Sequence, residues 1–95
     1  METQFYIEIR LKTGSNWESF AKFYIGNDRK KANAIFKKLQ GMEANEKNVL
    51  QIDFTEKVAA LPVNIKMLSC TLDQLAENCK CITKELFKLK NLEVY

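Results

Sequence analysis

The sequence predicts an α+β domain in which two ββα units form one four-stranded, mainly antiparallel sheet with two helices on one face. Two pairs of segments alternate apolar and polar residues with a period of two, which is typical of half-buried strands. Each pair precedes a segment with apolar residues at helical spacing. The predicted order is therefore hairpin, helix, hairpin, helix, in units of about 4–42 and 49–92 within a single domain spanning 1–95.

The first predicted hairpin joins strands near 5–11 and 18–25 through the turn residues TGSNW. In the first strand Phe5, Ile7, Ile9 and Leu11 share one side. In the second strand both sides are aromatic, because Phe23 falls on one side with two apolar residues while the other side carries Phe20, Lys22 and Tyr24.

The first predicted helix begins at Asn27 or Asp28, whose side chains accept hydrogen bonds from unpaired backbone amides. Gly41 suits a left-handed helix end. Between them the apolar side of the helix contains Ala32, Ile35, Phe36, Leu39 and Met42.

The second predicted unit contains strands near 49–55 and 63–67 and a long helix. Pro62 is expected at the start of its strand, where a missing N–H costs least. Thr71 followed by Gln74 forms a capping box at the helix start. The residues expected to face the core from this unit are Leu50, Ile52, Phe54, Val63, Ile65, Met67, Leu75, Ala76, Cys79, Ile82, Leu86 and Leu89.

Each ββα unit has one apolar sheet face that must be covered. Both faces are covered when the two helices lie on the same side of a single sheet. The simplest strand order is 1-2-4-3, with the second and fourth strands parallel at the centre. This layout resembles a circular permutation of the ferredoxin-like fold. The resemblance concerns topology alone, so it transfers no functional residue.

Composition and charge exclude several classes of protein. The chain is 46% hydrophobic, carries a formal charge of +3 and lacks histidine. No apolar stretch approaches the ~18 residues of a membrane span, so no membrane partner is expected. The odd count of three cysteines favours a reducing compartment, and we expect a cytoplasmic protein.

Neither a metal site, a cofactor nor a catalytic centre is expected. Cys79 falls on the apolar side of the second helix, whereas Cys81 points about 160° away from it, so the two thiols cannot hold one ion. Nothing in the sequence places two carboxylates around a pocket with a base. The chain is therefore predicted to be no enzyme.

The open side of the predicted sheet is the first candidate for function, because clustered aromatic residues on an exposed sheet face mark interfaces. The predicted interaction face consists of Tyr6, Arg10, Phe20, Lys22, Tyr24 and Lys66. The favoured function is a non-catalytic module that self-associates through this face as a homodimer. The alternative is stacking of single-stranded nucleic acid on the same rings, and the third hypothesis is that VAAL or the C-terminal NLEVY covers them.

A second basic face is predicted on the outer side of the first helix. Its residues are Lys30, Lys31, Lys37 and Lys38. Such a face is most often solvated, and attraction of an acidic protein partner or a phosphate backbone is the functional alternative.

Overall fold

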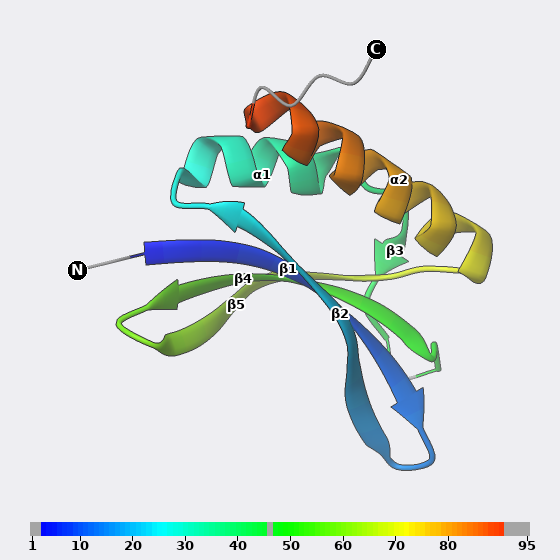
Figure 1. The fold of residues 1–95 in the computed structure, drawn as a ribbon. Helices are drawn as coiled ribbons and strands as arrows, with labels where there is room; N and C mark the ends of the chain where they lie inside the picture. The colour runs from blue at the N-terminus through cyan, green and yellow to red at the C-terminus, as the bar shows by residue number, and fades with distance from the viewer. Residues whose placement is uncertain (1–2, 46, 91–95) are drawn as a thin grey trace.

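The computed structural model describes residues 3–45 and 47–90, which form one sheet with two helices on one of its faces (Figure 1). In chain order the elements are β1 (Thr3–Thr13), β2 (Asn16–Gly26), α1 (Arg29–Lys37), β3 (Met42–Glu43), β4 (Leu50–Val58), β5 (Leu61–Ser69) and α2 (Leu72–Leu89). The α+β class and both predicted hairpins and helices are confirmed. The end of the predicted second unit, residues 91 and 92, lies outside the described residues.

The strand order differs from the prediction. The five strands follow the order β2-β1-β4-β5-β3, and each neighbouring pair is antiparallel. The expected order 1-2-4-3 is wrong, because the first strand of each hairpin, β1 and β4, forms the centre. The ferredoxin-like topology and the central parallel pair are therefore not what the chain adopts.

Burial explains why β1 and β4 are central. Phe5, Tyr6 and Ile7 are consecutive buried residues of β1, and β4 is buried without interruption over 52–55. Side chains of strands with neighbours on both sides are flanked by more side chains than those of outer strands, and most of β2 and β5 is indeed exposed or half-buried. Pro62 in β5 agrees with a strand near the margin of the sheet.

The core lies between the sheet and the two helices. Many of the predicted core residues are buried there, and Ala76 is exposed. The predicted core residues that are only partly buried are Phe23, Leu50, Ile65, Cys79, Leu86 and Leu89. Two predictions for β5 are wrong, because Val63 and Met67 are exposed while Leu68 packs against the core. The buried apolar residues are Phe5, Ile7, Ile9, Ile25, Ala32, Ile35, Phe36, Leu39, Ile52, Phe54, Cys70, Leu75 and Ile82.

Both predicted helix starts are confirmed. Asp28 caps α1 by accepting a hydrogen bond from the Lys31 amide at 3.1 Å. At α2 the Gln74 amide donates to the Thr71 hydroxyl at 3.1 Å, and the Gln74 side chain accepts from the Thr71 amide at 2.9 Å. Neither helix has the length and apolarity needed to cross a bilayer, within the described residues.

The α1 end differs from the prediction. The helix ends in a right-handed cap at Lys38, and Gly41 does not adopt a left-handed conformation. A Cβ at Gly41 would lie 2.7 Å from the Ser69 carbonyl oxygen, so glycine instead permits the close approach that lets β3 pair with β5. Met42, predicted on the helix, is exposed in β3.

Candidate binding face on the open side of the sheet

The face of the sheet opposite the helices is hollowed into a trough of about 530 Å³. Two strands lie between β2 and β5, so a flat sheet would separate these outer strands by roughly 14 Å. Residues of both nevertheless line one hollow, which means that the sheet curves around it. The trough is lined by Tyr6, Glu8, Arg10, Trp17, Ser19, Pro62 and Asn64.

A second hollow has a volume of about 370 Å³, and Trp17 lines both this hollow and the trough. The segment after β3 forms one side of this hollow. Its other residues are Lys12, Ser15, Ala44, Asn45, Gln51 and Met67. The single tryptophan of the chain is therefore shared by the two hollows.

A β-bulge decides which residues of β2 face the trough. Ile9 pairs with Ala21 while Arg10 pairs with Ser19, so Phe20 has no partner in β1. The extra residue reverses the alternation toward the start of the strand. Trp17, which an unbroken alternation would place on the helix side, consequently joins the trough side, and the sequence carries no signal for this change.

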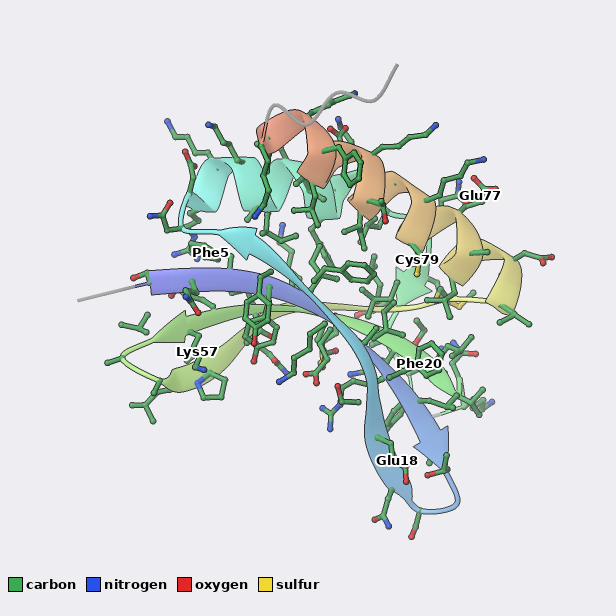
Figure 2. All side chains as sticks on the ribbon, in the orientation of Figure 1. Phe5, Glu18, Phe20, Lys57, Glu77 and Cys79 are labelled. Atoms are coloured by element: carbon green, nitrogen blue, oxygen red, sulfur yellow. The ribbon has the colours of Figure 1, made fainter. Side chains whose placement is uncertain are left out.

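Phe20 is absent from the residues that line the two hollows, although its ring is 69% exposed. The ring neighbour of Tyr6 is Tyr24, and the place of Phe20 on the interaction face stays a prediction. The bulge leaves it on the edge strand of the sheet (labelled in Figure 2).

Tyr6 and Tyr24 do lie together on the trough side, as the alternation predicts. They pair across β1 and β2 with ring centroids 5.7 Å apart. The Lys22 ammonium lies 5.3 Å from the Tyr6 ring centroid and 4.0 Å from a Glu8 carboxylate oxygen. These neighbours leave Tyr6 only 6% exposed, so Tyr24, at 53%, is the accessible ring of the pair.

A buried carboxylate orients Arg10 at the floor of the trough. Asp53 is 1% exposed and lies on β4, directly opposite Glu8. Its two oxygens are occupied separately, because Arg10 Nη1 lies 3.5 Å from Oδ2 and Gln51 Nε2 donates to Oδ1 at 2.7 Å. Asp53 and Gln51 are not among the predicted residues of the interaction face, since a polar residue on a strand is normally solvated.

Lys66 is the one predicted face residue that lies on the opposite side of the sheet. It pairs with the core residue Phe54 across β4 and β5, and its ammonium donates to the Asn33 side chain on α1 at 3.1 Å. A register shift next to Phe54 breaks the alternation of β5. Lys57 instead occupies the trough side at the far end of β4 (Figure 2).

The predicted basic face is present on the outer side of the helices. Lys30, Lys31 and Lys37 are exposed, whereas Lys38 reaches across to form an ion pair with Glu85 of α2. The hydrogen bond from Lys38 is the largest cause that holds the pKa of Glu85 below its usual value, and the same bond raises the pKa of Lys38.

The cysteines pack against the core rather than forming a site. Cys70 is buried, and Cys79 points from α2 toward the sheet (Figure 2). Burial raises the pKa of both thiols. Cys81 is half-buried against the core, so its predicted outward orientation is wrong. Among the described residues, no three His, Cys, Asp or Glu side chains are grouped as metal ligands.

The VAAL segment does not fold across the trough. It forms the tip of the β4–β5 hairpin, where Val58 pairs with Leu61. The other predicted cover, NLEVY, lies outside the described residues. Within the described residues, the fold and the hollows thus define a small sheet-and-helix domain with a trough on the face opposite the helices. Comparison of the chain with known family models, curated proteins and solved structures finds no match.

Proposed function

We propose that the protein is a non-catalytic binding module that holds an extended single strand of nucleic acid along the trough. The observation that carries the proposal is that Trp17 lines two hollows on the open side of the sheet. Bases of a single strand present flat faces to aromatic side chains, and such stacking tolerates any base sequence.

The aromatic and basic side chains are spaced along the same path. Tyr24 and Trp17 pair with β1 residues six positions apart, which separates the two rings by roughly 20 Å along the strand. Lys22 and Arg10 lie between these ends, and Lys12 pairs with Trp17 itself. An extended strand could therefore stack at both ends while its phosphates meet the cations between them.

Self-association through the trough, the first expectation from the sequence, has weaker support. An interface core of this kind needs contiguous apolar area. Among the described residues, the large apolar side chains exposed on the trough side are Tyr24, Met67 and Met42, which come from three different strands. The exposed ring of Phe20 is absent from the residues that line the two hollows.

The proposal is tested by titrating the protein with fluorescein-labelled 15-nucleotide oligo(dT) and oligo(U). Binding is followed by anisotropy, and quenching of the single tryptophan by unlabelled oligonucleotide reports contact at the trough. With three phosphate contacts, the logarithm of the affinity should fall with that of the salt concentration with a slope of about −2. Comparison of the two oligonucleotides distinguishes a DNA from an RNA preference.

Lys22→Gln and Lys37→Gln form a matched pair of variants, one on the trough side and one on α1. The first should weaken binding and reduce the slope by about 0.7, because one phosphate contact is lost. Lys37→Gln should leave both the affinity and the salt dependence unchanged. An unchanged tryptophan signal with both oligonucleotides, or a loss of binding confined to Lys37→Gln, would reject the trough as the binding surface.

A further inference from the structure

The outer side of β2 is a long sheet edge. β2 spans 11 residues and stands at the end of the strand order, with β1 as its single neighbour. The backbone N–H and C=O groups that point away from β1 form a template for another strand. Two of the exposed aromatic side chains, Phe20 at 69% and Tyr24 at 53%, lie on this strand.

The opposite margin of the sheet is less able to accept a strand. β3 pairs with the end of β5 through Met42 and Glu43. The remaining outer side of β5 contains Pro62, which has no N–H to donate, and Lys66. Proline and lysine on a margin discourage pairing with another chain. β2 also carries a lysine, Lys22, but it has no proline, so the two margins differ in the backbone N–H groups that they offer to another strand.

We infer that β2 pairs antiparallel with β2 of a second copy of this chain, so that the two sheets become continuous around a two-fold axis. A two-fold axis perpendicular to the sheet keeps the trough sides of both copies on one face and the helices of both on the other. This association rests on the edge of the sheet and not on the proposed nucleic-acid binding.

The bulge at Phe20 restricts the register of this pairing. Residues directly opposite in neighbouring strands lie on the same face of a sheet. Glu18 would attract Lys22 of the second copy, but Glu18 pairs with Leu11 on the helix side while Lys22 pairs with Glu8 on the trough side. That register is therefore excluded, in spite of its complementary charges.

A register shifted by one residue places opposite side chains on the same face of the sheet. It places Trp17 opposite Tyr24 of the second copy, and Ser19 opposite Lys22, all on the trough side. The pairing occurs twice by symmetry, so that each exposed Tyr24 ring gains a neighbouring Trp17 indole of the other copy, and the two Phe20 residues flank the axis. The alternative register, with Trp17 opposite Lys22, would leave Tyr24 beyond the paired segment.

The association is tested by sedimentation equilibrium over a concentration series, on protein whose ultraviolet absorbance ratio shows it to be free of nucleic acid. The expected mass is about 22 kDa, twice the 11.0 kDa of one chain. Phe20→Lys should give monomers, because it brings two like charges together at the axis. Phe87→Lys makes the same change at an exposed ring of α2 and should remain dimeric. Circular dichroism checks that both variants fold.

The register is tested at Ser19. Ser19→Glu should tighten the dimer about 2- to 30-fold, because two carboxylates then face two Lys22 ammonium groups, whereas Ser19→Lys should weaken it by a similar factor. A wild-type mass of 11.0 kDa at all concentrations would overturn the inference. A dimer that survives Phe20→Lys, or responds equally to both Ser19 variants, would exclude the proposed β2 pairing.

Discussion

The side chain of Asn78 on α2 pairs with the backbone of Gln40 in both directions. Its oxygen accepts from the Gln40 amide at 2.7 Å, and its nitrogen donates to the Gln40 carbonyl at 2.8 Å. Asn78 is 1% exposed, and it lies on the same side of α2 as the buried residues Leu75 and Ile82. The second helix is thereby tied to the segment that leads from α1 into β3.

The contact between Asn78 and Gln40 predicts that substitution of Asn78 alone lowers the stability of the protein. Asn78→Ala should lower the free energy of unfolding by about 1–3 kcal/mol, because the Gln40 amide and carbonyl both lose their partner in a part-buried contact. Urea unfolding measures the difference. Glu77→Ala, at the neighbouring exposed position (Figure 2), should change stability by less than about 0.5 kcal/mol. Equal effects of the two variants would contradict a specific role for the amide.

The β4–β5 turn should be improved by glycine. Ala59 and Ala60 have φ values of 50° and 69°, in the left-handed region that is costly for residues with a Cβ. Ala60→Gly should therefore stabilise the protein by about 0.5–1 kcal/mol, since relief of the left-handed strain exceeds the added chain entropy. Ala34→Gly, an exposed position of α1, should instead destabilise it by about 1 kcal/mol. A destabilised Ala60→Gly variant would refute the turn conformation.

The Lys38–Glu85 pair should make stability depend on pH. The lowered pKa of Glu85 means that the pair stabilises the fold above the ordinary carboxyl pKa of 4.5 and loses its effect as the pH falls through the folded pKa. The raised pKa of Lys38 means that the effect is also lost at high pH, as the pH rises through its folded pKa above 10.5.

The destabilisation caused by Glu85→Gln should accordingly be constant near neutral pH and shrink below 4.5. Urea unfolding of both proteins at about pH 7 and about pH 3 measures this. Glu77→Gln serves as the exposed control on the same helix. A cost for Glu85→Gln that stays the same at both pH values would show that the ion pair does not contribute.

Substitutions of Tyr24 and Phe20 should affect oligonucleotide binding and dimerisation separately. Tyr24→Ser removes an accessible ring from the end of the trough and should weaken oligonucleotide binding, since a stacked base contributes about 1–3 kcal/mol. Phe20→Ser should leave the oligonucleotide affinity of the monomer unchanged and raise the dimer dissociation constant. Anisotropy and sedimentation at matched salt measure the two quantities. A lower oligonucleotide affinity of the Phe20→Ser monomer would show that Phe20 belongs to the binding face.

Local sequence patterns determined the secondary structure and most of the core. The period of two in β1 predicted Ile7 and Ile9 as buried, and the Thr71 capping box predicted the start of α2, because both depend on residues close in the chain. The first helix start at Asp28 was predictable for the same reason. Tyr6, Arg10, Lys22 and Tyr24 were placed on the correct side of the sheet by the same alternation.

The tertiary structure alone decided the strand order and the composition of the trough. Alternation shows which residues share a face, but it carries no information on which strands become neighbours, so β1 rather than β2 became central. Single-residue bulges then reversed the faces within strands, which brought Trp17 into the trough and left Phe20 at the edge. The burial of Asp53 and Asn78 depends on partners from other segments, Arg10 and Gln40. A local sequence pattern cannot identify such partners, because they become neighbours only when the sheet and helices pack together.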